Sequence, residues 1–389
     1  MRNRLLLSIA FAVACVLVFI LFFWKTTDGD LPDAAGHPAI TRDTRLAAGL
    51  KHSLYIDGKG QLWTWGDSRY RNRPSAVPVK VADNACAVAA GDASATSFYI
   101  ACDGTLYGWG DSEVGQIGLF SETPVIEPMP ILSGITGISP GHDTPFAIDT
   151  ASILWTWGKV SPSRGEDVPG EETGEPIAEP RKVMELVQRV SSSATHTLAL
   201  REDRSLWVWG TNDSGALATG SHTAQNRPYK ADIAALQSKP IVKLATKNHA
   251  SFAITEDGSL YAWGYANASL PGKENAALPP KTLPVKVDFI DRVADIALGE
   301  ESALILKKDG SVWAYGAGPV VQTAKTGWTK PVHLMDDAVE IACGPRHALV
   351  LKKDGSLWSW GDNEAGQLGD GTTGNRAEPV RIRFPKPAS

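Results

Sequence analysis

Four histidines recur at one place in the chain, three residues after a short segment of small side chains. Imidazole binds metals and moves protons near neutral pH, so such a set could form a metal or acid–base site. Other repeats carry Ser94, Thr144 or Ser302 there, which is more typical of a side chain that bonds the backbone of its own turn. We therefore predict a structural role. The histidines are His52, His196, His249 and His347.

The other catalytic and cofactor-binding motifs are either absent or lack the flanking secondary structure that they require. Gly369, Gly371 and Gly374 have the spacing of a dinucleotide-binding loop, but a proline-led strand follows where that loop needs a helix. No metalloprotease histidine pair, phosphate-binding lysine loop, nucleophile-elbow serine or zinc-type cysteine pair occurs in the sequence. We predict no catalytic residue, no cofactor and no metal, and favour a protein that is not an enzyme.

The cysteines differ in their setting. Cys86 and Cys102 flank one hairpin at nearly equal distances from its turn, so their Cα atoms can come within the roughly 4.4 to 6.8 Å that a disulfide requires. We predict that they are bonded. Cys15 and Cys343 lie in apolar or small-residue segments and are most simply buried apolar groups. Asn212 and Asn267 begin N-glycosylation triplets, which matter only if the host glycosylates.

A five-residue motif, which we call the Trp-Gly phrase, recurs along the chain. It ends in Trp-Gly in six copies and in Tyr-Gly in the copy at 312–316. It occurs seven times and holds eleven of the thirteen tryptophans. The mean repeat, about 49 residues, is typical of propeller blades. Alternate side chains of a strand point to opposite faces, and both faces of this phrase are apolar, as stacked blades require. The phrases are 62–66, 106–110, 154–158, 206–210, 260–264, 312–316 and 357–361.

Each repeat contains three readable strands and a fourth after a variable loop. A small-residue strand comes first, then an apolar strand that ends in most repeats at Asp-Gly, a pair that favours a tight hairpin. The Trp-Gly strand follows, and the fourth strand begins at or near a proline. Asp149-Thr150 and Asp203-Arg204 lack the glycine, so we expect looser turns there. Seven units of four strands predict an all-β, seven-bladed β-propeller.

The last strand leaves two ways to close the ring. Pro379 to Ile382 has no Trp-Gly strand after it, so it can complete the first blade and remove an exposed edge. We expect this closure. In the alternative register the same segment is the outer strand of blade seven.

The repeat at Gly344–Gly369 resembles the regulator of chromosome condensation repeat family. The resemblance rests on two motifs of this repeat, Gly344-Pro345-Arg346-His347 and Asn363-Glu364-Ala365-Gly366-Gln367-Leu368-Gly369. The segment Gly110–Gly118 resembles the second motif. The resemblance covers all seven repeats and implies a seven-bladed propeller. The family's founding member is a chromatin-bound exchange factor for the small GTPase Ran, and other relatives are secreted inhibitors or adaptor domains. Fold alone does not transfer any of these functions.

The N-terminus departs from the founding member. Residues 5–24 carry no charge, follow Arg2 and Arg4, and are long enough to span a bilayer. The basic residues favour a cytoplasmic N-terminus, with the propeller periplasmic or extracellular. A cleaved signal peptide and a lipid anchor at Cys15 are the alternatives. We predict a transmembrane signal anchor at 1–25, a linker at 26–43, the propeller at 44–384 and a tail at 385–389.

Charge disfavours a nucleic-acid partner. Without Arg2, Arg4 and Lys25 the chain has 35 basic and 43 acidic residues, a net of −8, whereas backbone binding to nucleic acid needs a positive surface. We therefore expect a membrane-tethered scaffold that binds a protein or peptide through its long-loop face. The alternatives are an extracytoplasmic hydrolase or lyase with a site at the propeller axis and a guanine-nucleotide exchange factor.

The expected binding surface follows from strand order. In an antiparallel blade, the turn after the small-residue strand and the loop after Trp-Gly emerge on one side, and loops on a rigid scaffold carry recognition. The expected partner-binding residues are Lys51, His52, Arg69, Tyr70, His142, Asp143, Asn212, His249, Glu300, Glu301, Arg346, His347, Asn363 and Glu364.

Overall fold

The computed structural model describes residues 44–91, 94–159, 175–236, 239–265, 281–321 and 331–385. The expected anchor at 1–25 and linker at 26–43 lie outside these residues, as do the last four residues of the tail. No helix within the described ranges is long and apolar enough to cross a membrane.

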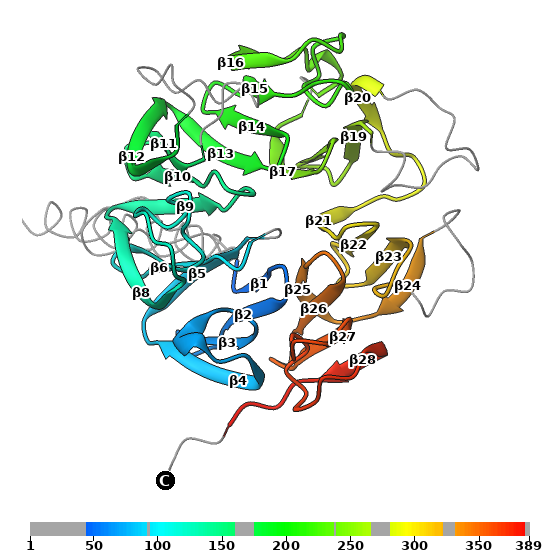
Figure 1. The fold of residues 1–389 in the computed structure, drawn as a ribbon. Helices are drawn as coiled ribbons and strands as arrows, with labels where there is room; N and C mark the ends of the chain where they lie inside the picture. Colours follow the sequence, from blue (N-terminus) through cyan, green and yellow to red (C-terminus); the bar gives the residue numbers. More distant parts are fainter. Residues whose placement is uncertain are drawn as a thin grey trace, which may run out of the picture. The chain divides into compact units, whose positions relative to one another are not determined.

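The described chain forms seven antiparallel sheets of four strands each, which we number blades one to seven (Figure 1). Blade one is β1 (Leu46–Ala48), β2 (His52–Ile56), β3 (Leu62–Gly66) and β4 (Ser75–Ala82), and blade two is β5 (Ala85–Ala90), β6 (Ser97–Ala101), β7 (Leu106–Gly110) and β8 (Val125–Leu132). Blade three is β9 (Ile135–Ser139), β10 (Phe146–Asp149), β11 (Leu154–Gly158) and β12 (Ile177–Met184), and blade four is β13 (Val187–Ser192), β14 (His196–Arg201), β15 (Leu206–Gly210) and β16 (Gln225–Lys230).

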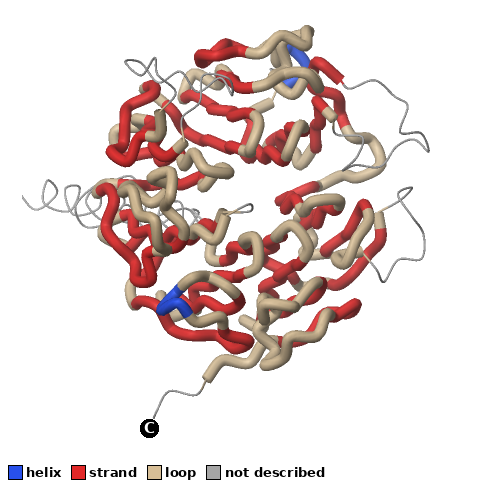
Figure 2. The backbone as a smooth tube through the Cα atoms, in the orientation of Figure 1, coloured by secondary structure: helices blue, strands red, loops and turns tan. Residues whose placement is uncertain are grey.

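The remaining blades repeat this order. Blade five is β17 (Ile241–Lys247), β18 (Ala250–Thr255), β19 (Leu260–Gly264) and β20 (Lys281–Lys286), and blade six is β21 (Val293–Leu298), β22 (Ser302–Lys307), β23 (Val312–Gly316) and β24 (Val332–Met335). Blade seven is β25 (Ala338–Cys343), β26 (His347–Lys352), β27 (Leu357–Gly361) and β28 (Arg376–Arg381). Between the strands lie loops and the short 3₁₀ helices η1 (Tyr70–Asn72) and η3 (Ala234–Leu236) (Figure 2). The all-β, seven-bladed propeller is thus confirmed.

The Trp-Gly phrase forms the third strand of every blade. Its residues have the same burial in all seven copies, with the first aromatic half-buried and the other four positions buried. Gly66 shows why the phrase ends in glycine: its φ is +79°, and a Cβ there would collide with the backbone oxygen of Lys51. The glycine lets the chain leave the sheet beside the first turn of its own blade.

The hairpins between second and third strands are alike even without glycine. Gly104 in blade two has φ +86°, and Arg204 takes the same place in blade four with φ +65°. Both N–H groups donate across the turn at 2.9 Å, to Ala101 and Arg201 respectively. In blade three the Asp149 carboxylate accepts the N–H groups of two turn residues at 2.9 Å. The expectation of looser turns was wrong, because side-chain hydrogen bonds fix the same geometry.

Six of the seven fourth strands begin earlier than their prolines indicated, and β24 begins at Val332, just after Pro331. β4 starts at Ser75 and β28 at Arg376, three residues before Pro78 and Pro379. The fourth strand is the outer edge of each sheet, and proline is tolerated where an N–H is not needed for the ladder. The register shifts in this part of both pairs, β3 with β4 and β27 with β28.

β28 pairs with β27 and completes blade seven. The expectation that Pro379–Ile382 completes blade one was wrong, and the alternative register is the one observed. Each repeat supplies a whole blade, so no strand is exchanged. Blades seven and one instead meet through side chains: Ile382 joins a buried cluster with residues of both blades, and the ring of Phe384 lies 5.2 Å from Tyr55 and 5.4 Å from Trp63.

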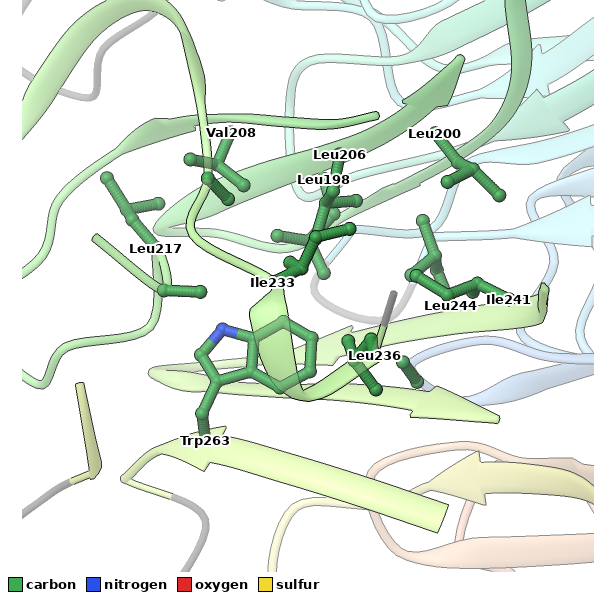
Figure 3. Close-up of a cluster of buried hydrophobic side chains, with 13 residues drawn as sticks. Leu198, Leu200, Leu206, Val208, Leu217, Ile233, Leu236, Ile241, Leu244 and Trp263 are labelled. Atoms are coloured by element: carbon green, nitrogen blue, oxygen red, sulfur yellow. The ribbon is translucent and has the colours of Figure 1, made fainter. Parts of the chain in front are cut away.

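The core of the described residues consists of seven separate clusters, one in each interface between neighbouring blades. Figure 3 shows the cluster between blades four and five, where Trp263 faces Leu217, Ile233 and Leu236. The first strands touch in sequence around the centre, and β25 touches β1. The ring is therefore closed by packing of side chains rather than by a shared strand.

Phe384→Ala tests this closure. Phe384 is half-buried against three aromatic rings of blade one, so we expect the variant to lose about 1 to 2 kcal/mol of unfolding free energy, less than a fully buried phenylalanine. Urea unfolding followed by tryptophan fluorescence measures it. Phe120→Ala, at a side chain that is 57% exposed, is the control and should change stability by less than about 0.5 kcal/mol. Equal losses in both variants would contradict a closing role.

Candidate functional site

Strand order gives the ring two different ends. At one end, which we call the loop end, lie the turns between first and second strands and the loops between third and fourth strands. At the other, which we call the hairpin end, the first strands begin and the second and third strands are joined. Figure 1 shows the seven blades around their inner strands.

Three of the four predicted histidines are buried in contacts between blades. His347 Nε2 is 3.0 Å from Ser53 Oγ of the next blade, and His52 Nε2 is 2.9 Å from Ser97 Oγ. His196 makes the same contact with Ser251 at 2.6 Å. The structural role is as predicted, but the partner that all three share is a serine of the neighbouring blade. His196 also contacts its own turn, where its Nδ1 is 3.0 Å from Thr195 Oγ1.

The histidine and its serine occur together. His52 directly precedes Ser53 at the start of the second strand. The residues equivalent to His52 in blades two to seven are Thr96, Thr144, His196, Ala250, Ser302 and His347. The residue equivalent to Ser53 is a serine contacted by the preceding blade only where that preceding blade has a histidine at the His52 position. Where the preceding blade has Thr96, Thr144, Ala250 or Ser302 instead, the residue equivalent to Ser53 is Pro145, Thr197, Ala303 or Ala348, respectively.

Two members of the predicted set were misplaced. Ser94 and the exposed His249 both precede the buried position, which Thr96 and Ala250 occupy in their blades. The turn before the second strand varies in length, so counting from the small-residue segment does not reach the same structural position in every repeat.

Burial controls the charge of the three buried histidines. It lowers the pKa of His52 and His196 to about 3 and that of His347 to about 4. All three are therefore neutral near pH 7, and each ring bonds the hydroxyl group of its serine. They are not exposed, so the prediction that His52 and His347 contact a partner was wrong.

Tryptophans of the Trp-Gly strands form a second contact between blades. The indole N–H of Trp65 donates to the Gln367 backbone oxygen of blade seven at 2.8 Å. Trp157, Trp263 and Trp360 donate to the loops of their preceding blades at 2.7 to 2.8 Å. These bonds position the loops after the third strands.

Buried amides hold the same loops in shape. Asn363 is fully buried, accepts the Leu368 N–H at 2.9 Å and donates to the Thr372 and Gly374 backbone oxygens at 3.0 and 3.1 Å. Asn212 does the same in blade four with Leu217, Ser221 and Thr223. Neither residue is exposed to a partner, contrary to the prediction, and a folded Asn212 cannot accept a glycan. Asn267 lies outside the described residues.

The other predicted residues divide by exposure. Tyr70 is buried against Trp109, so the prediction that it is a surface residue was wrong. Arg69 is half-exposed and bonds Asp67 of its own blade and Asp111 of blade two, and His142 pairs with Asp143. The exposed members all lie at the loop end: Lys51, His249, Glu300, Glu301, Arg346 and Glu364.

A cavity of about 590 Å³ lies at the hairpin end, on the axis of the ring. Every blade contributes the same register position to its lining, the residue immediately before Leu46 and before its counterparts in the other first strands. We call these seven positions the axial ring. In blade order they are Arg45, Ala87, Gly137, Arg189, Lys243, Asp295 and Glu340.

Two pairs of opposite charge form in the axial ring. Arg45 Nε is 3.6 Å from Glu340, which also accepts the Leu46 N–H at 2.8 Å. Lys243 pairs with Asp295. Burial raises the pKa of Glu340 to about 7 despite these donors. Because that pKa exceeds the ordinary 4.5, the contribution of Glu340 to stability falls as pH rises from about 4.5 to about 7.

The axial ring was missed in the sequence. Small residues such as Ala47 and Ala342 indicate the first strands, and that pattern does not include the charged position before them. Aligning the repeats a little earlier gives Arg45-Leu46-Ala47 against Glu340-Ile341-Ala342 and exposes the variable charged position. That the position faces an axial cavity follows only from the tertiary structure.

The predicted cysteine pair is bonded in the structure, with Cα atoms 5.0 Å apart. Cys86 is the bulged residue of β5, between the paired positions Ala85 and Ala87. No group of three or more histidine, cysteine or acidic side chains suited to a metal is present within the described ranges.

Comparison with known proteins identifies the repeats. Residues 187–216 and 338–367 match one model of the regulator of chromosome condensation (RCC1) repeat, and residues 354–388 match another. Residues 187–216 and 338–388 therefore carry RCC1 repeats. In human E3 ubiquitin-protein ligase HERC2, 280 residues are 26% identical, covering 67% of this chain. The mitochondrial RCC1 domain-containing protein RUG3 of Arabidopsis thaliana is 28% identical over 296 residues, also 67% of this chain.

These matches cover 5% of HERC2 and 64% of RUG3, so the chain spans less than two thirds of either relative. Among solved structures, human WBSCR16 superposes with a TM-score of 0.69 at 20% identity, over 81% of this chain and 86% of that one. Prp20p of Saccharomyces cerevisiae, which was characterised with its binding to Gsp1p and histones, gives 0.64 at 20% identity, over 77% and 80%. These structures share the propeller fold of this chain.

His196→Gln should change how stability depends on pH. A histidine whose folded pKa is about 3 stabilises the protein fully above its unfolded pKa of about 6.5, and this stabilisation is lost at about 1.4 kcal/mol per pH unit as pH falls below that value. We expect the variant to be less stable at pH 7.5 but to lose less on acidification to pH 4.5. Denaturant unfolding at several pH values measures this.

Ser251→Ala is the matched control, since it breaks the same bond and keeps the histidine. It should lower stability at pH 7.5 and retain the steep acid dependence. If both variants keep the steep dependence, His196 is not a source of the acid sensitivity.

Proposed function

We propose that this RCC1-repeat propeller is a membrane-tethered, extracytoplasmic scaffold that binds a protein partner at its loop end. The observation that carries the proposal is the construction of that end. Exposed charged residues of both signs stand on turns and loops whose own buried groups are fixed by bonds within and between blades. A rigid surface with mixed charge binds a protein with little loss of conformational freedom.

The relatives support an interaction role. Prp20p is described by its binding properties to Gsp1p and histones, and HERC2 is a ubiquitin-protein ligase much longer than this chain. The match to HERC2 lies within 5% of that protein, so its ligase activity is not carried over to this chain. What the relatives share with this chain is the propeller, which favours a binding module over a catalytic domain.

The tether rests on the sequence of residues 5–24, which is uncharged, follows two arginines and has the length of a bilayer span. The bonded cysteines of blade two agree with an oxidising compartment, where disulfides persist. An exchange factor for a cytoplasmic GTPase would require the opposite topology.

The hydrolase or lyase alternative has one observation in its favour. Asp295 and Glu340 come from neighbouring blades, line the axial cavity and interact, since Asp295 contributes to the raised pKa of Glu340. Each carboxylate is also paired with a cation, Lys243 or Arg45, which leaves neither free to act on a substrate without first losing its partner. We therefore favour the scaffold.

The proposed topology is tested with protease added outside intact cells or spheroplasts. A propeller outside the membrane should be digested from that side, while a cytoplasmic marker protein stays intact. Full protection of the propeller until the membrane is permeabilised would contradict the proposal. The same samples, denatured without reductant and treated with a maleimide, should show Cys86 and Cys102 unlabelled.

The proposed face is tested by charge reversal at three exposed loop-end residues, Lys51→Glu, Glu301→Lys and Glu364→Lys combined. Their side chains stand on turns outside the buried networks, so we expect partner capture to fall several-fold while the melting temperature stays within about 2 °C. Quantitative proximity labelling in membranes, scored on proteins enriched by the wild type, measures capture.

The matched control carries one basic and two acidic reversals at the hairpin end: Lys59→Glu, Glu202→Lys and Glu256→Lys. It should keep wild-type capture. Loss of capture in this control, with retention in the loop-end variant, would put the partner at the opposite end of the ring. Neither variant includes Arg69 at the loop end or Lys307 at the hairpin end, because each forms an ion pair that charge reversal would break.

A further inference from the structure

Within the described residues, the axial ring has one cation without a counter-charge. Going round the seven equivalent positions, Glu340 pairs with Arg45 and Lys243 pairs with Asp295. Arg189 remains. Its Nε is buried and has no hydrogen-bond partner in the part of the chain that the structure describes. A buried donor without a partner costs about 1 to 3 kcal/mol, more for a charged group, so this position favours any anion that can reach it.

Space for such an anion lies in the same cavity. The two positions that precede Arg189 in the axial ring are Gly137 and Ala87, so neither of them places a side chain larger than a methyl group at the ring. A Cβ added at Gly137 would meet no atom within 4 Å, and its backbone is not in the left-handed region. The open volume, about 590 Å³, is in the range of small-ligand sites.

The rest of the lining sets the character of the ligand. The guanidinium fork of arginine matches the two oxygens of a carboxylate. Apolar side chains lie beside the charged ring and share the wall with polar ones, so the ligand can carry an apolar body next to its carboxylate. We propose that the axial cavity is a binding site for a small carboxylic acid with an apolar body, held by Arg189. The apolar wall is Ile100, Ile138, Ile148, Val190, Leu244 and Leu306.

The site is independent of the loop-end surface, since it opens at the other end of the ring. It also contrasts with the chain as a whole, whose net charge outside the N-terminal segment is −8. General attraction of anions to this protein is therefore weak. An anion would be retained only by a local arrangement such as the guanidinium of Arg189, whose Nε is buried.

The axial ring makes binding depend on pH. The groups that face Glu340 are Arg45 and the Leu46 N–H of blade one and Asp295 of blade six. Protonation of Glu340 would free Arg45 and raise the charge of the ring from +1 to +2, counting three cations against two carboxylates and then against one. The affinity for a carboxylate should therefore rise several-fold between pH 8 and pH 6.

The test is calorimetric titration of the full chain in detergent micelles with 4-methylpentanoate and with N-acetyl-leucine. Both should bind more tightly than inorganic phosphate, which lacks the apolar body, while 4-methylpentan-1-ol and N-acetyl-leucine amide should not bind. Arg189→Gln should weaken carboxylate binding by about tenfold or more, the size expected for a charged hydrogen-bond pair. Arg189→Lys keeps the charge and loses the fork, and should fall between.

Two further variants separate the site from general charge effects. Arg204→Gln removes one positive charge from an exposed turn at the same end and should bind as the wild type does. Gly137→Phe keeps every charge and fills the open sector, so it should abolish binding. Each variant's melting curve shows whether it is folded.

Glu340→Gln mimics the protonated ring and should bind at pH 8 as tightly as the wild type does at pH 6. The proposal is overturned if neither carboxylate binds at millimolar concentration, or if folded Arg189→Gln or Gly137→Phe binds as the wild type does. It is also overturned if the alcohol binds as tightly as the acid, because the cavity is then only an apolar site.

Discussion

Burial of one large aromatic side chain per interface is the constraint on which this ring depends. The second aromatic of each Trp-Gly phrase is almost completely buried against the neighbouring blade, and in four blades it is a tryptophan whose indole N–H bonds a backbone oxygen of the preceding blade. Truncating such a side chain to alanine typically costs about 3 to 5 kcal/mol. Because the bond points at one carbonyl, it also fixes how far the blades can slide past one another.

The histidine–serine contacts extend the same principle. A hydrophobic interface resists separation but allows small rotations, whereas a buried hydrogen bond is lost when either atom moves. Three interfaces add this restraint, including the one between blades seven and one. The closing interface has no shared strand, so His347, the Trp65 indole and Phe384 together replace the backbone pairing that an exchanged strand would provide.

The two ends of the ring differ in the kind of surface that they present. The loop end carries exposed residues on segments of varied length, while the polar groups behind them are satisfied internally by Asn212 and Asn363. At the hairpin end the turns between second and third strands are alike, while the axial position varies from glycine to arginine. Large exposed surfaces suit a macromolecule, and a walled cavity of small-ligand size suits a compact molecule.

The sequence by itself determined the repeat, the number of blades, the four strands of each and the cysteine pair, because these follow from local signals: strand alternation, turn residues and a recurring phrase. It put Asn363 and His347 at the loop end correctly but as surface residues, since spacing along a strand cannot tell an exposed polar side chain from one buried against the next blade. Tertiary structure decided what depends on contacts between repeats. The register of β28, the serine partners of the histidines and the axial ring each became visible only in the folded ring, and Ser53 lies 294 residues from His347. The tertiary structure likewise decides that Arg189 has no counter-charge among the described residues, because this depends on which side chains lie near it in space.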